Sequence, residues 1–204
     1  PDRQNISWPE YFIAQVPHPT PRQKCRHQFA SSCISESRDL HEVTEITRII
    51  NQETLVMIIL LDYWLANSDR TRKNILLQEE EPGTYRIYSI DHAEIFTSPR
   101  WSIQNLRPQS RRLMKSATHE MLCRFIEREE EFWEGLEVIQ LMPVLLLEEI
   151  VAAVPDDWHL TKEERKAIVA FLIQQRKKSL PKIIRRFIQN VYHPIRMEIA
   201  EGNS

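Results

Sequence analysis

Three oxygen-bearing side chains in the first half of the chain have a spacing that could support chemistry. Asp69 is followed five positions later by Asn74, and Asp91 ends the hairpin-like stretch that comes after them. At such a spacing in phosphoryl-transfer enzymes, one carboxylate orients the attacking hydroxyl, and an Asn and an Asp hold magnesium against nucleotide phosphates. Amide and carboxylate oxygens are the hard donors that magnesium prefers. Asp69 is therefore the expected catalytic residue, and Asn74 and Asp91 are the expected metal ligands.

Basic residues stand within the same stretch. Arg70, Arg72 and Lys73 lie between the expected catalytic residue and the first expected metal ligand. They could balance the charge of bound phosphates, and we assign this role to Arg70 and Lys73. In the alternative interpretation the stretch is only a capped loop: Asp69 and Asn74 satisfy backbone amides, and the basic side chains face water.

A predicted β-hairpin explains how these residues could meet. Residues 75–77 read as a short strand, residues 80–83 contain Pro and Gly in turn positions, and residues 85–90 alternate as a returning strand. Pairing of the two strands would bring their open ends, at Asn74 and Asp91, to within a strand spacing of about 5 Å. Two ligands that are distant in sequence could then hold one cation.

Helical patterns surround the hairpin. The apolar run 55–61 covers more than one helix face, which predicts a buried helix that ends near Asn67. Further along, Pro143 fits the first turn of a helix, residues 161–164 form a capping box, and Pro181 restarts or kinks a helix. The fold class is therefore predicted to be α+β and mostly α.

Composition limits the broad class of protein. The apolar content of 42%, the charged content of 27% and the net charge of -2 are ordinary for a globular protein and give no reason to expect nucleic acid as a partner. The longest apolar run is too short to cross a bilayer, which takes about 20 residues.

None of the three glycines precedes residue 83, so no glycine-rich phosphate loop can lie before it. Cys25, Cys33 and Cys123 are widely spaced, and we expect reduced thiols in a cytoplasmic protein.

Two other groups of residues suggest sites for which we prefer simpler explanations. Cys25, His27, Cys33 and His41 could be imagined as a zinc site, but they lack the close pairs typical of one. The basic residues between 176 and 186 could contact anionic lipid or nucleic acid. Because the chain as a whole is not basic, a solvated helix face explains them better.

The sequence around the expected site is similar to a known family. Residues 61–77, LDYWLANSDRTRKNILL, and residues 89–96, SIDHAEIF, resemble the HipA-like kinases, and more distantly the type II phosphatidylinositol kinases. The specific match covers residues 55–96, and residues 155–178 resemble the family's tail. The resemblance implies a bilobal protein-kinase-like fold with ATP and magnesium as cofactors.

Carried over by motif position, the resemblance gives Asp69 the catalytic role and Asn74 and Asp91 the metal-binding roles. It also implies that the backbone of a connector meets adenine; these residues are Gln28, Phe29, Ala30 and Ser31. The γ-phosphate of ATP would be transferred to a hydroxyl acceptor, which could be a protein Ser or Thr, a lipid headgroup or a metabolite.

The chain departs from the family's pattern in three places, one of which is that no His-Arg pair precedes Asp69. The lysine-bearing strand and phosphate-covering loop of the smaller lobe have no counterpart upstream of residue 25, and Asp91 is followed by His92 and Ala93 instead of Phe and Gly. We therefore expect a kinase-like C-lobe over residues 39–204, preceded by an extended segment and lobe connector over residues 1–38, with the N-lobe absent.

Two other functions stay open. The chain could be a catalytically silent kinase-like module that binds a partner through its helical face. It could also be an unrelated helical adaptor, which would be favoured if residues 75–90 proved helical.

Overall fold

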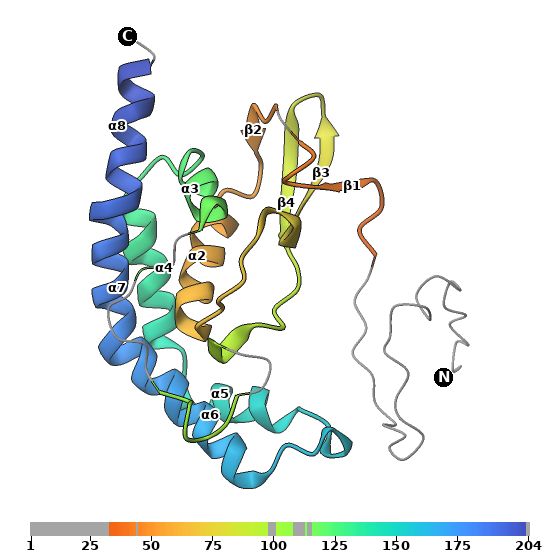
Figure 1. The fold of residues 1–204 in the computed structure, drawn as a ribbon, viewed down its shortest axis with the longest axis vertical. Helices are drawn as coiled ribbons and strands as arrows, with labels where there is room; N and C mark the ends of the chain where they lie inside the picture. The colour runs from red at the N-terminus through yellow and green to blue at the C-terminus, as the bar shows by residue number, and fades with distance from the viewer. Residues whose placement is uncertain (1–32, 44, 98–100, 108–112, 114–115, 203–204) are drawn as a thin grey trace.

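The protein is described by a computed structural model that places residues 33–43, 45–97, 101–107, 113 and 116–202. A small β-sheet stands beside a larger body of helices, and one helix lies between the two (Figure 1). The fold is therefore α+β and mostly helical, as predicted.

The sheet is built around the predicted hairpin. Its order is β1-β3-β4-β2, in which β1 is antiparallel to β3, β3 to β4, and β2 runs parallel to β4. The strands are β1 (Ser37–Asp39), β2 (Arg48–Ile49), β3 (Ile75–Glu81) and β4 (Thr84–Ser89). Because residues 75–81 and 84–89 are strands, the condition that would have favoured an unrelated helical adaptor is not met. The expected domain boundary after residue 38 falls inside β1.

Gly83 makes the hairpin turn possible. Its φ of +74° lies in the left-handed region that glycine adopts without steric cost. A Cβ at this position would also lie 2.7 Å from Oγ1 of Thr47. The Gly83 carbonyl accepts hydrogen bonds from the N–H groups of Thr47 (2.9 Å) and Arg48 (3.1 Å), so the turn joins the hairpin to the segment that carries β2.

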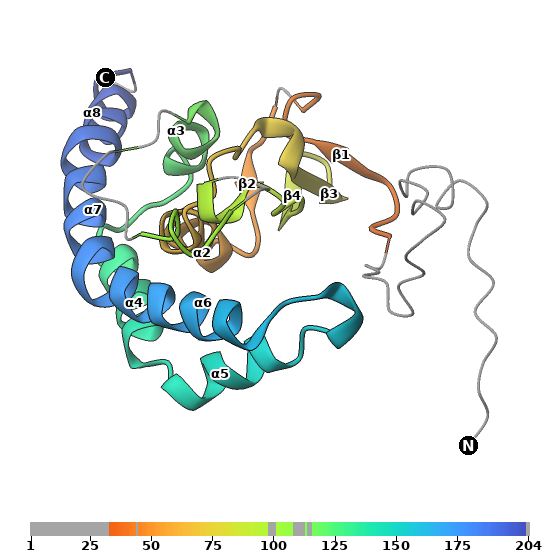
Figure 2. The same cartoon turned by 60° about the horizontal axis from the view of Figure 1, so that its bottom comes forward.

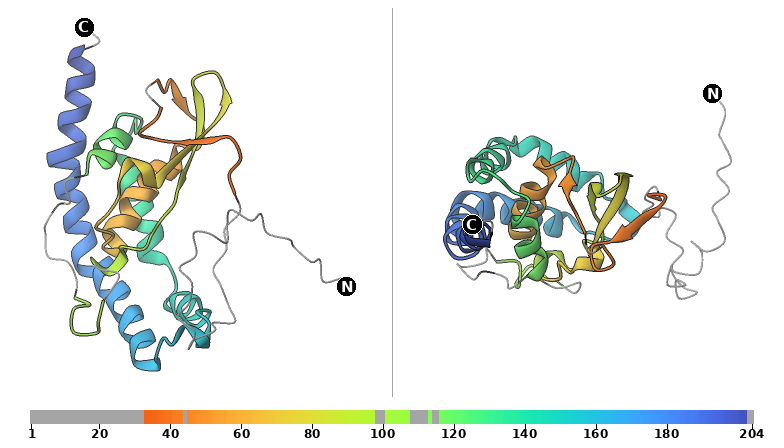
Figure 3. Two further views of the ribbon diagram at one scale, coloured as in Figure 1. Left: turned by 45° about the vertical axis from the view of Figure 1, so that its right-hand side comes forward. Right: turned by 90° about the horizontal axis from the view of Figure 1, so that it is seen from above.

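Helix α2 (Glu53–Leu65) is the central helix predicted from the apolar run. It lies between the sheet and the long C-terminal helices in both Figure 1 and Figure 3. Side chains on more than one of its faces are buried, which agrees with its continuous apolar sequence. The indole of Trp64 donates a hydrogen bond to the carbonyl of Leu172 (2.9 Å), and the amide of Gln175 donates to the carbonyl of Tyr63 (2.9 Å). These contacts fix the C-terminal helices against α2.

Of the remaining helices, α3, α4 and α7 pack on α2 and α5 packs on α6, and Figure 2 shows the long C-terminal run that α6, α7 and α8 form. Thr161 and Glu164 make the predicted capping box at the start of α6, Pro143 is the N-cap of α5, and Pro181 lies in the first turn of α7. The helices are α3 (Ala117–Cys123), α4 (Glu130–Leu141), α5 (Val144–Ala152), α6 (Lys162–Gln174), α7 (Leu180–Phe187) and α8 (His193–Gly202). None of the described helices has the length and apolar character needed to cross a bilayer.

The prediction of a solvated basic face holds for the exposed Lys177, Lys178, Lys182, Arg185 and Arg186, and the exception is Arg176. It lies in a π-helical segment between α6 and α7, Gln175–Ser179, and it is only 3% exposed. Its guanidinium donates to the carbonyls of Ile139 and Met142, which end α4 without helical partners of their own. The wider π turn explains the inward position, because it shifts the register of the residues that follow it.

Candidate active site

The site begins at the end of α2. Ala66 adopts the left-handed conformation (φ 53°) and reverses the chain, and the N–H of Asn67 donates to the carbonyl of Asp62 (2.8 Å). The Asn67 side chain donates to the carboxylate of Asp62 (2.8 Å) and accepts from the N–H of Asp69 (3.3 Å). One amide side chain therefore joins the last turn of the helix to the loop that carries the expected catalytic residue.

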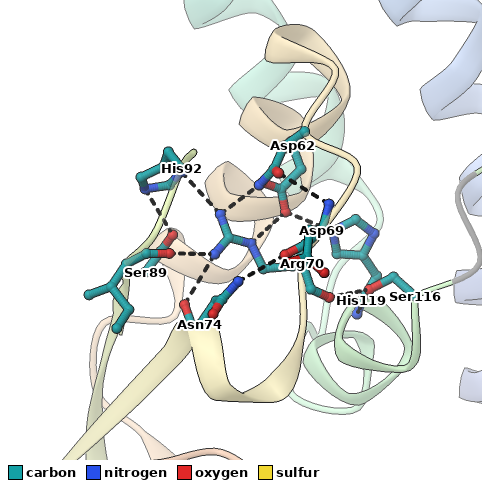
Figure 4. Close-up of polar contacts among 10 residues, drawn as sticks. Asp62, Asp69, Arg70, Asn74, Ser89, His92, Ser116 and His119 are labelled. Atoms are coloured by element: carbon teal, nitrogen blue, oxygen red, sulfur yellow. Dashed lines mark hydrogen bonds and ion pairs between the residues drawn. The ribbon is translucent and has the colours of Figure 1, made fainter. Parts of the chain in front are cut away.

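Arg70 connects the parts of the site. A guanidinium has five N–H donors, and each of them has an acceptor here (Figure 4). Nε and Nη2 donate to the two carboxylate oxygens of Asp62 at 2.9 Å each. Nη1 donates to the backbone carbonyls of Asn74 (3.1 Å) and Ile90 (2.9 Å), and Nη2 also contacts Nδ1 of His92 (3.1 Å). Arg70 thus holds the end of α2 against the two chain segments at the open end of the hairpin.

This position of Arg70 differs from the one expected from the sequence. Its side chain is 1% exposed and that of Asp62 is 2% exposed, so the pair is buried. With every N–H donor engaged, the guanidinium has none left for a phosphate group. Arg70 is therefore a positioning residue of the loop in this structure, and Arg72 and Lys73 are the exposed basic residues beside Asp69.

Asp62 is the charged centre of this network. Burial raises its pKa, but hydrogen bonds and charge from His119 and Arg70 outweigh the burial, so the pKa of this carboxyl lies below its ordinary value. Its four acceptor contacts are two from Arg70, one from Asn67 and one from Nε2 of His119 at 2.9 Å. The Nδ1 atom of His119 is buried and has no hydrogen-bond partner among the described residues.

His92 closes the network on the hairpin side. Burial and the adjacent Arg70 charge lower the pKa of His92, so the imidazole is neutral at pH 7. A neutral ring accepts the Arg70 N–H at Nδ1, and its Nε2–H then donates to Oγ of Ser89 at 3.4 Å. His92 therefore joins Arg70 to the last residue of β4.

The hairpin register brings the backbones of the two expected metal ligands to the open end of the hairpin. Ile75 pairs with Ser89, and the N–H of Ile90 donates to the carbonyl of Asn74 (3.0 Å). The Asn74 side-chain nitrogen donates to the carbonyl of Asp69 (2.9 Å), which leaves its amide oxygen available as a ligand. Asp91 follows Ile90, is exposed, and has a φ of 51°.

The conformation of Asp91 is uncommon for a residue with a side chain. The left-handed region costs a residue other than glycine about 1 kcal/mol, although Asp tolerates it better than most. Such positions often mark functional sites when the surrounding structure enforces them. Here the Asp91 carboxylate accepts from the N–H of Ala93 (3.2 Å), and the hydrogen bonds of Ile90 hold the preceding residue in place.

Asp69 lies at a pocket with a volume of about 510 Å³. Its carbonyl accepts from the Asn74 side chain and from the N–H of Thr71 (3.1 Å), which fixes the backbone. The carboxylate is exposed and makes no hydrogen bond or ion pair with the described residues. A fixed backbone with an unengaged carboxylate suits a group that must accept a proton from a bound molecule.

Of the other residues considered from sequence, His41 lines the pocket at Asp69, and several lie outside the described residues. The expected adenine connector, residues 28–31, and two members of the imagined zinc site, Cys25 and His27, lie outside the described residues. Cys33 and His41 are exposed. Among the residues that are described, no group of three or more His, Cys, Asp or Glu side chains gathers as a metal site would.

A comparison with protein families gives a match over most of the chain. The model of a family described as HipA-like kinase matches residues 1–189. The chain belongs to the HipA-like kinase family. Comparisons with curated proteins and with solved structures give no match. The family membership supports a kinase-like function in general terms, and it confirms the resemblance that was drawn from the residues around Asp69.

Sequence reasoning on this HipA-like kinase missed the residues that hold the loop in place. Asp62 and His119 were not singled out, although Asp62 is the one charged residue within the apolar sequence of α2 after Glu53. A carboxylate in a helix that is apolar on all faces needs a partner. That requirement indicates a nearby basic partner, but Arg70, Arg72 and Lys73 all follow in the same loop, so the sequence alone does not say which one it is.

Proposed function

We propose that this HipA-like kinase transfers the γ-phosphoryl group of ATP to a hydroxyl group of an acceptor, and that residues 39–204 form the C-lobe of a protein-kinase-like fold. The observation that carries the proposal is the loop of residues 67–74, in which Asp69 is exposed and unengaged while Arg70 holds Asn74 and Ile90 together. Phosphoryl transfer depends mainly on positioning and charge neutralisation. A rigid loop supplies the positioning.

The donor set at the hairpin end fits a magnesium ion. Asn74 offers a neutral amide oxygen and Asp91 a carboxylate, and magnesium sites of this kind are completed by phosphate oxygens and water. When bound there, magnesium would neutralise charge on the phosphates of ATP.

In this proposal the chain's own residues have separate roles. The Asp69 carboxylate orients the acceptor hydroxyl and takes its proton as the new P–O bond forms and the bond between the γ-phosphorus and the bridging oxygen of ADP breaks. Lys73 contributes positive charge near the transferred group. Arg70 keeps its backbone partners in place and does not touch the phosphates.

The proposal is tested with the full-length protein. Asp69→Asn should keep magnesium-ATP binding in calorimetry but lower phosphate transfer from labelled ATP by about 100- to 10,000-fold, the range for loss of a general base. Asp91→Ala should weaken magnesium-ATP binding. Asp156→Asn, which changes an exposed carboxylate paired with Arg165, is the matched control and should change neither.

The alternative of a silent partner-binding module has one observation in its favour. Large apolar side chains are exposed along α4 and α5, among them Leu141 (72%), Leu145 (64%) and Ile150 (56%). The same experiment discriminates between the two functions. If the wild-type protein binds no magnesium-ATP and Asp69→Asn changes nothing, the kinase proposal fails and the module is favoured.

A further inference from the structure

The pocket at Asp69 lies on one side of the proposed catalytic residue. Residues of the loop line it together with His41 and the start of α3, but Asn74 and Asp91 do not. If magnesium and the ATP phosphates bind at the hairpin end, this pocket is the space on the acceptor side of Asp69. Its volume, about 510 Å³, is in the range for small-molecule sites.

Positive charge at this pocket is uncompensated. Arg72, Lys73 and His41 line it and are exposed, and their side chains make no ion pair or hydrogen bond with the described residues. Among the described residues that line the pocket, Asp69 is the only carboxylate. By contrast, the exposed Arg86 pairs with an acidic neighbour at 2.7 Å. The pocket therefore offers at least two cations to a ligand with negative charge.

The rest of the lining is polar. Ser68 and Thr71 are exposed there, and among the described lining residues only Ala117 has a purely apolar side chain. Hydroxyl groups can both donate and accept hydrogen bonds, as the hydroxyls of a polyol do.

From this lining we infer that the acceptor is a small polyhydroxyl compound that carries a phosphate group, with its phosphate on Arg72 and Lys73 and a hydroxyl at Asp69. The inference rests on the proposed function. A phosphate can place oxygens on both adjacent cations, and Arg binds phosphate through two parallel hydrogen bonds. The same chemistry is present in a free sugar phosphate and in a phospholipid headgroup, and the experiment separates these sources.

Binding to the full-length protein is measured without ATP. The probes are glucose 6-phosphate, glycerol 3-phosphate, inorganic phosphate, phosphatidylglycerol vesicles and, as the uncharged control, glucose. The variant Arg72→Gln/Lys73→Gln is compared with Lys177→Gln/Lys178→Gln, which removes two adjacent, exposed lysine charges in the π-helical segment between α6 and α7.

At least one organic phosphate should bind more tightly than glucose and inorganic phosphate. Its dissociation constant should rise about 10- to 100-fold in Arg72→Gln/Lys73→Gln, the effect of losing charged hydrogen bonds. The control variant should bind as the wild type does. Preference for the vesicles over the soluble phosphates would identify a lipid headgroup as the source. If no organic phosphate binds, or if both double variants bind alike, the inference is overturned.

Turnover separates this inference from the function on which it rests. Phosphate transfer that needs Asp69 but proceeds equally in wild type and in Arg72→Gln, for example to a serine peptide, would overturn the inference and leave the kinase proposal standing, because Lys73 is unchanged in that variant. Charge-dependent binding of an organic phosphate without any ATP-dependent transfer would overturn the kinase proposal alone.

Discussion

Replacing Arg70 with Met would test whether the buried ion pair determines the stability of the site. Met keeps an unbranched apolar stem of similar length, so the main change is the loss of the guanidinium. The Asp62 carboxylate would lose two of its four hydrogen bonds and its only arginine partner while it stays buried. Removal of one partner from a buried pair costs about 3–5 kcal/mol of unfolding free energy. This is a large part of the roughly 5–15 kcal/mol that holds a domain folded.

The matched control is Arg86→Met on the sheet surface. Arg86 and Glu80 are closer, at 2.7 Å, than Arg70 and Asp62 at 2.9 Å, but their side chains are 41% and 42% exposed. Exposed pairs contribute about 0–1 kcal/mol because water screens them. Urea unfolding at pH 7 should therefore show a small change for Arg86→Met and a large one for Arg70→Met, although the shorter distance alone would predict the opposite.

The cost of Arg70→Met should also depend on pH. In the wild type, hydrogen bonds lower the pKa of Asp62 despite its burial. The contribution of Asp62 to stability is therefore fully present above the ordinary carboxyl pKa of about 4. This contribution is lost as the pH falls through the lower pKa of the folded state. Without Arg70, burial is opposed only by the hydrogen bonds from His119 and Asn67 and by the His119 charge, so the folded pKa of Asp62 should rise. Stability is then lost as the pH rises through that higher value, so the difference from wild type should be smaller at pH 5 than at pH 7.

A loss below about 1 kcal/mol at pH 7 would refute this reasoning about a buried charge. So would an equal loss at pH 5 and pH 7. The double variant Asp62→Asn/Arg70→Met removes the charge itself and should be more stable than Arg70→Met at pH 7. If it is less stable, lost packing explains the effect.

Three further predictions concern other parts of the chain. Asp91→Gly should leave the unfolding free energy unchanged or raise it by up to about 1 kcal/mol, because glycine adopts the left-handed conformation of this position without strain. ATP-dependent transfer should be lost in the same variant. Thr161→Ala should lower the unfolding free energy by about 1 kcal/mol in urea titrations, because the N-cap of α6 is lost. Burial raises the pKa of Cys123 to about 12, so iodoacetamide at pH 8 should label Cys33 in the folded protein and reach Cys123 only in urea, as read by peptide mass spectrometry.

The parts of the fold that the sequence predicted well depend on local rules. The hairpin of residues 75–89 has alternating side chains around a Pro-Gly turn, and β3 and β4 pair as that pattern indicates. The α6 capping box needs only Thr161 and Glu164, three residues apart. Helix α2 follows from an unbroken apolar run. In each case neighbours in sequence are also neighbours in space.

The contacts that were not predicted join distant parts of the chain. His119 meets Asp62 across 57 positions, and nothing local to either residue indicates this. Arg176 lies in a basic segment that reads as a surface, and a π turn places it inside. Arg70 was expected to bind phosphate because the three basic residues after Asp69 look alike in sequence. Only the fold shows that Arg70 is buried, whereas Arg72 and Lys73 are exposed.

The burial of the Asp62–Arg70 pair favours a role in positioning over one in stability. Apolar residues of similar volume often fill such a place without loss of stability, so a buried ion pair is weak evidence that stability required it. What an apolar pair could not do is join three backbone elements at defined points. The planar guanidinium reaches the carboxylate on α2 and the carbonyls of Asn74 and Ile90 at once, with distances of 2.9 to 3.1 Å. The proposed metal ligands are Asn74 and Asp91, the residue after Ile90. The Arg70 side chain therefore fixes the backbone at both places relative to Asp69. The cost of that geometry is the desolvation of two charges.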